Sequence, residues 1–242
     1  MYSVADIHAP QVLAQEDDFL VLYKPPRMHS APLGESAECL LSWCAGHYPE
    51  VGRLGGRSPG EGGLIHRLDY ETQGLLLVAR TPGGMEALLS QQREGRFMKE
   101  YRALCGTMEL GPETAALEGF PAPPEWAASG KIVSAFRAYG RGRRAVRPLP
   151  EGRELYKTEI IDRIDLDLST FSYTLRLTRG FRHQVRCHLA WIGRPILNDP
   201  LYGGRNEGRG LLGLRATALE FTHPQGAQSL RYEIPGLNFV EV

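Results

Sequence analysis

The sequence lacks long apolar runs, a charge imbalance and a secretion signal. No apolar stretch approaches the roughly 20 residues of a membrane-spanning helix, and no basic segment precedes an apolar one at residues 1–13. Basic and acidic side chains number 28 each, so the net charge is zero. Neutrality argues against coating nucleic acid through global charge. It leaves room for a local basic groove, because such binding depends on the phosphates contacted.

Paired cysteines are also missing. No Cys-x-x-Cys spacing links Cys39, Cys44, Cys105 and Cys187, and we expect free thiols in a reducing cytoplasm. The 242 residues, 42% hydrophobic and 23% charged, are typical of a soluble globular chain with one large domain or two closely packed lobes. The basic residues are mostly arginine. Arginine forks onto phosphates and stacks on bases, which suits RNA, although genome composition produces the same bias.

A polar cluster, His66 to Glu71, precedes the apolar run Leu75 to Val78. Such a short run is typical of a buried strand. A carboxylate held just before a buried strand is well supported and can reach into a cleft, so Asp69 is a candidate functional residue. In the alternative interpretation, Asp69 belongs to an Asx turn and Arg67 is its solvated ion-pair partner.

Residues 66–75 resemble the signature of the RluA branch of pseudouridine synthases, His-Arg-Leu-Asp-x-x-Thr-Ser-Gly-Leu, with only the serine replaced, by Gln73. The resemblance implies that Asp69 is the catalytic residue. It also implies that Arg67 takes the place of the base that is flipped out of the RNA. His66 belongs to the same motif, and we assign it to substrate binding.

A second motif lies at residues 98–106, where alternation predicts a strand with Tyr101, Ala103 and Cys105 on one face. The pattern Lys-x-Tyr-x-Ala at residues 99–103 resembles a motif of the same family, whose tyrosine stacks on the target base. The resemblance therefore makes Tyr101 a substrate-binding residue. The residues alone favour a core or cross-strand tyrosine.

Residues 179–190 carry a third motif, with helical spacing from His183 to Trp191 and an apolar stripe to anchor the helix. They resemble the family's Gly-Arg-x-His-Gln-Ile-Arg-x-His-Leu, and residues 193–203 resemble the Gly-x-Pro-Ile-x-Gly-Asp-x-x-Tyr-Gly that follows it. The arginine after Gln-Ile pairs with the catalytic aspartate in that family, so Arg186 is the predicted partner that orients Asp69. Phe181 stands where the family usually has arginine, and the next residue is a candidate to supply that charge. We assign three residues of this motif to substrate binding: Arg182, His183 and Gln184.

The same helix offers candidate metal ligands, because His183 and Cys187 are four residues apart and His188 adjoins them. No second ligand pair with suitable spacing occurs elsewhere. We therefore expect neither a metal nor a cofactor.

Basic residues occur without an acidic one from Lys131 to Arg147, with Phe136 and Tyr139 between them. Alternation predicts a strand at residues 131–139 and a loop at 140–147. An arginine-rich loop with nearby aromatic residues suits phosphate contact and base stacking, and a solvated charged hairpin is the alternative. The predicted RNA-backbone contacts are Arg141, Arg143, Arg144 and Arg147.

The remaining pattern predicts an α+β fold: a mixed, largely antiparallel sheet with flanking helices and a central catalytic cleft. We expect one catalytic domain over residues 1–242, an atypical insertion at about 107–157, and no N-terminal accessory RNA-binding domain, because only about ten residues precede the first hairpin. A surface excursion is expected at residues 109–129. Further predicted elements are strands at 12–14, 19–23, 155–164, 171–178 and 214–224, and helices at 36–45, capped by Ser36, and 84–93.

The activity implied by the resemblance is isomerisation of uridine to pseudouridine in structured ribosomal or transfer RNA. The target base would be flipped out, and Asp69 would act as nucleophile at C1′ or as base at C2′. One alternative is an RNA-binding module of the same fold without turnover. The other is a glycoside hydrolase, for which the motifs offer no second carboxylate. We expect a cytoplasmic monomer whose partner is RNA, with no membrane association.

Overall fold

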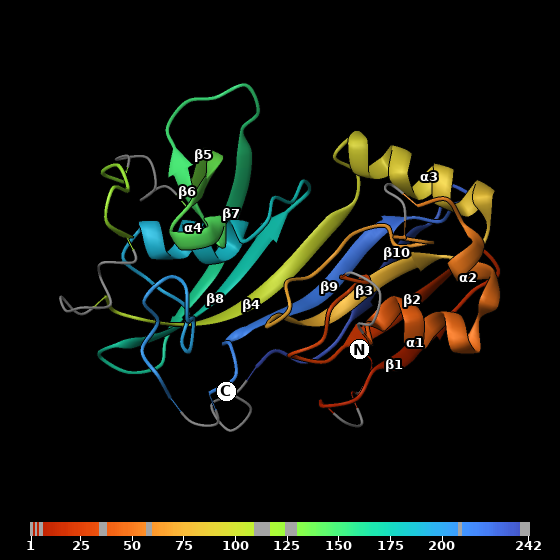
Figure 1. Ribbon diagram of the computed structural model, residues 1–242, viewed down its shortest axis with the longest axis horizontal. Helices are drawn as coiled ribbons and strands as arrows, with labels where there is room; N and C mark the ends of the chain where they lie inside the picture. The colour runs from red at the N-terminus through yellow and green to blue at the C-terminus, as the bar shows by residue number, and fades with distance from the viewer. Residues whose placement is uncertain are drawn as a thin grey trace. The chain divides into compact units, whose positions relative to one another are not determined.

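The computed structural model describes residues 2, 4, 7–33, 38–56, 60–108, 117–123, 130–207 and 210–237. The chain divides into two compact units. The first consists of Met1–Lys99 and Arg215–Gly236, and the second of Glu100–Leu214 and Leu237–Val242. Figure 1 labels the helices and strands of both. In the described part of the chain, no helix has the length and apolarity needed to cross a membrane.

The first unit is built on a mixed sheet. The antiparallel hairpin of β1 (Gln11–Gln15) and β2 (Phe19–Lys24) is confirmed, and it ends where Pro25 begins. β2 pairs antiparallel with β3 (Gln73–Ala79), and β3 pairs parallel with β9 (Leu214–Thr222), which pairs antiparallel with β10 (Ser229–Glu233). Every residue of β2 and β3 is buried, as their continuous apolar runs predict.

The core of this unit lies between the sheet and α3 (Pro82–Arg93). Alternate residues of β2 and β3 face Met85 and Leu88 of α3. α3 begins at Pro82 because proline is favoured in the first helical turn and Thr81 Oγ1 accepts the Gly84 N–H at 3.0 Å. The predicted helix at 84–93 is therefore confirmed, with its start two residues earlier.

The first helix begins later than predicted. α1 (Leu40–His47) is capped by Cys39, and the expected cap Ser36 lies outside the described residues. Cys39 bridges to His29 in extended conformation, so the helix cannot include it. The Ser42 hydroxyl accepts the Cys39 N–H at 3.0 Å and completes the cap. α2 (Pro49–Arg53) follows.

In the described residues of the second unit, the strands follow the order β4 (Met98–Gly106), β8 (Thr170–Leu177), β7 (Tyr156–Asp165), β5 (Lys131–Tyr139) and β6 (Ala145–Leu149). β7 and β8 form the predicted antiparallel pair, and β5 pairs antiparallel with β7 and β6. The pairings of both units together give the mixed, largely antiparallel sheet that the sequence predicts.

The predicted loop at 140–147 is wrong in its second half. Ala145–Leu149 forms β6, and Arg147 pairs with Arg137 of β5. Positive φ angles of 74° at Gly140 and 66° at Gly142 make the turn tight. Ala145 and Val146 are buried against α4 (Gln184–Trp191), which favours strand over solvated loop.

α4 confirms the predicted helix, but it is buried at all eight positions instead of along one stripe. It packs against β6 and β7 (Figure 1). Its last residue, Trp191, donates from Nε1 to the Pro121 carbonyl at 2.7 Å. The described part of the expected surface excursion, residues 117–123, thus contacts the unit, while 109–116 and 124–129 lie outside the described residues.

Candidate active site

Asp69 lies half-buried in a turn that leads into β3. The turn is closed by the Thr72 N–H, which donates to the Asp69 carbonyl at 3.1 Å. Just before it, Ser30 Oγ accepts the Leu68 N–H at 3.0 Å and donates to the Leu68 carbonyl at 2.8 Å. Both backbone groups of Leu68 are therefore fixed, which holds the chain on the N-terminal side of Asp69.

Gly74 allows the turn to enter the sheet. Its φ is 124°, and a Cβ there would stand 2.2 Å from the Ala216 carbonyl oxygen of β9. No side chain fits so close to a neighbouring backbone. A larger residue would push β3 from β9 and displace the turn that carries Asp69.

Arg67 is exposed and pairs with Glu61 at 2.9 Å, not with Asp69. The interpretation of Arg67 as the solvated partner of Asp69 is thus wrong. With 63% of the Arg67 side chain accessible, this pair contributes little to stability. The guanidinium can leave Glu61 at small cost, as a residue that replaces a flipped base must.

His66 is buried on the other side of the same segment. Its Nε2 accepts the Leu77 N–H of β3 at 3.3 Å, and its ring centroid lies 5.3 Å from that of Phe97. These contacts tie the start of the motif to the sheet. The assignment of His66 to substrate binding stays a prediction.

Lys24 is a residue of this region to which sequence reasoning gave no chemical role. Its Nζ is buried and donates to the carbonyls of Pro25 and Met28, each at 2.8 Å, and of Tyr70 at 3.3 Å. Burial lowers the Lys24 pKa from 10.5 to about 7, and the Asp69 and Glu71 carboxylates oppose that fall. A lysine at the end of an all-buried strand was the available signal, because buried lysines need partners.

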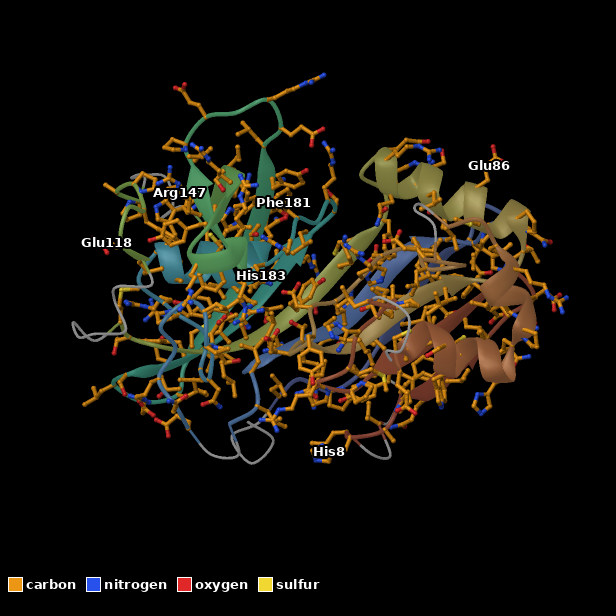
Figure 2. The ribbon with its side chains drawn as sticks, in the orientation of Figure 1. His8, Glu86, Glu118, Arg147, Phe181 and His183 are labelled. Carbon is orange, nitrogen blue, oxygen red and sulfur yellow. The ribbon has the colours of Figure 1, made fainter. Side chains whose placement is uncertain are left out.

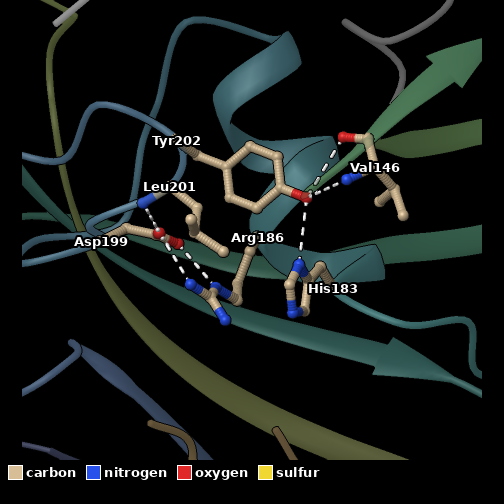
Figure 3. Close-up of polar contacts among 6 residues, drawn as sticks. All are labelled: Val146, His183, Arg186, Asp199, Leu201 and Tyr202. Atoms are coloured by element: carbon tan, nitrogen blue, oxygen red, sulfur yellow. Dashed lines mark hydrogen bonds and ion pairs between the residues drawn. The ribbon is translucent and has the colours of Figure 1, made fainter. Parts of the chain in front are cut away.

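In the second unit, Arg186 on α4 forms a bidentate ion pair with Asp199 (Figure 3). Nε donates to Oδ2 at 2.8 Å and Nη2 to Oδ1 at 2.9 Å, and neither side chain has exposed area. Asp199 Oδ1 also accepts the Leu201 N–H at 2.9 Å. Asp199 lies within the motif at 193–203, yet the sequence gave no reason to link it to Arg186. The predicted pairing of Arg186 with Asp69 stays a prediction.

Tyr202 closes the same network. Its hydroxyl accepts the Val146 N–H at 2.9 Å and donates to the Val146 carbonyl at 3.2 Å. His183 Nδ1 lies 3.3 Å from that hydroxyl, and the Arg186 guanidinium carbon lies 5.7 Å from the Tyr202 ring centroid. His183 itself caps α4 with a φ of 56°. The network therefore joins the start of α4 to β6.

The other two polar residues of the third motif also have defined contacts. Gln184 is buried and donates from Nε2 to the Lys157 carbonyl at 2.9 Å and to Thr158 Oγ1 at 3.1 Å. Arg182 donates from Nη2 to the carbonyls of Arg143 at 2.9 Å and Ala145 at 3.2 Å. Arg182 thus fixes the turn of the β5–β6 hairpin. Its role as a substitute for the family's arginine stays a prediction, as does substrate binding by Gln184.

Metal ligation at α4 is disfavoured by the contacts of its ligand candidates. His188 is buried, with Nδ1 2.8 Å from Thr158 Oγ1 and Nε2 2.9 Å from Ser134 Oγ, and burial lowers its pKa to about 3. Burial also raises the pKa of the Cys187 thiol. Within the described residues, no group of three His, Cys, Asp or Glu side chains could hold a metal ion.

Tyr101 lies on β4, which confirms the predicted strand, and is buried together with Ala103 and Cys105. Burial does not follow the predicted alternation, because Glu100 and Leu104 of the opposite face are buried as well. Three of the predicted RNA-backbone arginines are exposed in the hairpin turn: Arg141, Arg143 and Arg144. The fourth, Arg147, is half-buried on β6 and donates to the Gly119 carbonyl at 3.2 Å. Contact of these four arginines with the RNA backbone stays a prediction.

Comparison with known proteins gives one consistent family. The family described as RNA pseudouridylate synthase matches residues 18–191. An uncharacterized RNA pseudouridine synthase of Chloroflexus aurantiacus is 32% identical over 88% of this chain and 61% of its own length. Ribosomal large subunit pseudouridine synthase D of Pasteurella multocida is 28% identical over 96% of this chain and 69% of its own length. The chain thus spans about two thirds of the length of these relatives.

A solved structure titled human RNA Pseudouridylate Synthase Domain Containing 1 is similar with a TM-score of 0.58 and 18% identity, covering 96% of this chain and 85% of that one. This similarity supports the α+β fold. The family match covers most of the chain and includes Asp69, Tyr101 and Arg186 within its bounds. The chain therefore belongs to the RNA pseudouridylate synthase family.

Proposed function

We propose that this protein isomerises uridine to pseudouridine in RNA, with Asp69 as its catalytic residue. The observation that carries the proposal is the intact His-Arg-Leu-Asp motif, whose aspartate is half-buried in a turn fixed by Ser30 and Lys24. A carboxylate positioned in this way loses little freedom when a substrate arrives.

The reaction detaches uracil from C1′ of the ribose, turns it and rejoins it through C5. All atoms of the substrate remain in the product, so the overall change needs no redox cofactor and no second substrate. Asp69 acts either as nucleophile at C1′ or as base at C2′. Both roles require an ionised carboxylate, and the motif assigns Arg186 to orient it.

The substrate must leave its helical stack before Asp69 can reach C1′. Arg67, exposed and weakly paired, is suited to fill the vacated place, and Tyr101 is assigned to stack on the flipped uracil. We propose loops of ribosomal or transfer RNA as substrates, because an unpaired base costs least to extrude. The same proposal places the protein in the cytoplasm, where such RNA is found, and includes a monomeric state.

The test is a pseudouridine map of total RNA from cells with and without this protein, followed by incubation of the deficient RNA with purified protein. We expect at least one uridine that is modified only when the protein is present, and we expect Asp69→Asn to bind the RNA without modifying it. Binding without modification by the unaltered protein would support an RNA-binding module instead. Release of free uracil would support a glycoside hydrolase.

A further inference from the structure

Phe181 replaces the arginine of the family motif, and its side chain remains 36% exposed. Its ring is stacked on Phe136 of β5, with centroids 5.0 Å apart and planes 9° from parallel. Tyr156 of β7 lies 5.1 Å from Phe181, and buried His188 lies 4.9 Å from Phe136. Phe181 is therefore the most exposed ring of an aromatic cluster that begins inside the second unit. Figure 2 labels Phe181.

The backbone of Phe181 is held on both sides. Its N–H donates to Gln184 Oε1 at 3.0 Å, and its carbonyl accepts the Gln184 N–H at 3.1 Å. Gln184 is itself fixed to β7 at Lys157 and Thr158. An exposed aromatic ring that is held this firmly loses little entropy when another ring binds on it.

Positive charge lies next to this ring. Arg182, the following residue, donates to two carbonyls of the β5–β6 turn, at Arg143 and Ala145. In the described part of the chain, the exposed arginines of that turn form no ion pair. Two acidic residues are nearby: Glu154 accepts the Tyr156 hydroxyl at 2.8 Å and lies 3.8 Å from Arg179, and the Glu118 carbonyl accepts the Tyr139 hydroxyl. The turn thus presents cationic side chains that no acidic group among the described residues pairs with.

We propose that Phe181 is a stacking platform for an unpaired base of the RNA, and that Arg141, Arg143 and Arg144 bind phosphates of the same strand. The inference rests on the proposed function because it takes RNA as the ligand. An exposed ring beside unpaired arginines matches the alternation of bases and phosphates in a single strand. The family motif has a charged arginine at the position of Phe181. This protein would instead contact a base there, and the strength of that contact would not depend on salt concentration.

The experiment compares two probes, a ten-residue oligouridylate and a ribose-phosphate strand of equal length without bases. All proteins carry Asp69→Asn, so that the probe is not converted. We expect Phe181→Ala to weaken oligouridylate binding by about 5- to 150-fold, the range for losing one stacked base. Binding of the abasic strand should not change. Leu168→Ala, at a fully exposed position with 101% accessibility, is the matched control and should affect neither probe.

Phe181→Trp provides a readout that does not depend on affinity. Its added indole fluorescence should be quenched by oligouridylate and not by the abasic strand. Equal loss of both probes in Phe181→Ala, or absent quenching in Phe181→Trp, would overturn the platform. If quenching occurs but the unaltered protein forms no pseudouridine, the platform stands and the proposed activity fails.

Discussion

Gln73 and Arg215 are hydrogen-bonded to each other across β3 and β9, where they are paired in register. Arg215 donates to Gln73 Oε1 from Nη2 at 2.9 Å and from Nε at 3.3 Å, and the Tyr23 hydroxyl donates to the same oxygen at 2.7 Å. Both residues depart from the family: the motif at residues 66–75 has serine at the place of Gln73, and residues 214–224 resemble the family's closing Leu-His-Ala-x-x-Leu-x-Phe-x-His-Pro strand, with Arg215 at the place of its first histidine. The two departures are therefore in direct contact, although the residues are 142 positions apart.

The first prediction concerns this coupling. Gln73→Ser removes the acceptor of a buried guanidinium and should destabilise the protein by about 1–3 kcal/mol. Arg215→His alone should also destabilise it, whereas the double variant should be more stable than the sum of the two losses, with a coupling of about 0.5–3 kcal/mol. Urea unfolding measures all four free energies. Additive losses would show that the two departures are independent. Tyr23→Phe, which removes only a hydroxyl, is the control for perturbing the same oxygen.

Lys24 is expected to hold the turn that carries Asp69. Lys24→Met keeps most of the stem but leaves the carbonyls of Pro25, Met28 and Tyr70 without this donor. We expect the variant to lose stability and, because Tyr70 adjoins Asp69, to lose turnover by a larger factor than RNA binding. Steady-state kinetics and RNA titration check this. A variant with normal turnover would show that Lys24 does not position the turn.

The same lysine predicts a pH dependence. The Lys24 pKa is about 7 in the folded protein, and its ordinary value of 10.5 applies to the unfolded chain. Between pH 7 and pH 10.5 the unfolded chain therefore binds more protons than the folded protein. Stability must then rise with pH in this window, by at most about 1.4 kcal/mol per pH unit from one group. Urea unfolding from pH 7 to 9 should show a steeper rise for the unaltered protein than for Lys24→Met. Equal slopes would contradict the prediction.

Buried His188 predicts how the stability of the protein depends on pH below neutrality. Its pKa is lowered to about 3 from 6.5, because its ring is buried between Thr158 and Ser134. Below pH 6.5 the His188 ring binds a proton in the unfolded chain but not in the folded chain, so the free energy of unfolding falls as pH decreases towards 3. His188→Gln should flatten this part of the profile. A proton NMR titration in which the His188 ring titrates near its ordinary value would contradict it.

Local patterns were sufficient for much of the fold. The continuous apolar runs of β2 and β3 and the alternation of β7 and β8 predicted strands that the structure confirms. The predicted bounds were wrong where a contact with residues distant in sequence determines the secondary structure. α1 starts after Cys39 because of a bridge to His29, and β6 forms because its residues pack on α4. Neither contact is visible in the local sequence.

The motifs made Asp69 and Arg186 candidates for the site but did not indicate which groups hold them. Lys24 donates to the backbone carbonyl of Tyr70, in the turn that carries Asp69. Every residue type has such a carbonyl, so the sequence does not show which residue accepts the hydrogen bond. Asp199 follows Arg186 by 13 positions, on a turn whose direction the sequence does not give. Such supporting contacts depend on three-dimensional proximity and could be found only in the structure.

The basic hairpin turn should contribute to RNA affinity through counterion release. Replacing Arg141, Arg143 and Arg144 together with alanine should reduce the slope of log K against log salt by up to about 0.7 per lost phosphate contact on single-stranded RNA. Arg163→Ala is a suitable control, because that arginine is already paired with Asp165 at 2.7 Å. An unchanged slope in the triple variant would mean that the turn is only a solvated loop.

The last prediction separates two roles of Arg186. Arg186→Met leaves the Asp199 carboxylate buried without its ion-pair partner, which should destabilise the protein by about 3–5 kcal/mol. A loss of activity in this variant would therefore say nothing about Asp69. Adding Asp199→Asn removes the buried, unpaired carboxylate charge, and the side-chain oxygen of the asparagine can still accept the Leu201 N–H. The double variant should recover most of the lost stability.

Activity then distinguishes the roles. If Arg186 also orients Asp69, the double variant should fold, bind RNA and still form pseudouridine far more slowly than the unaltered protein at neutral pH. Thermal unfolding, RNA titration and pseudouridine assay measure the three properties. Arg182→Met is the comparison, because Arg182 contacts the hairpin backbone and its loss should weaken RNA binding more than turnover. Recovery of both stability and turnover in the Arg186/Asp199 double variant would show that Arg186 serves only to neutralise Asp199, and that another group must orient Asp69.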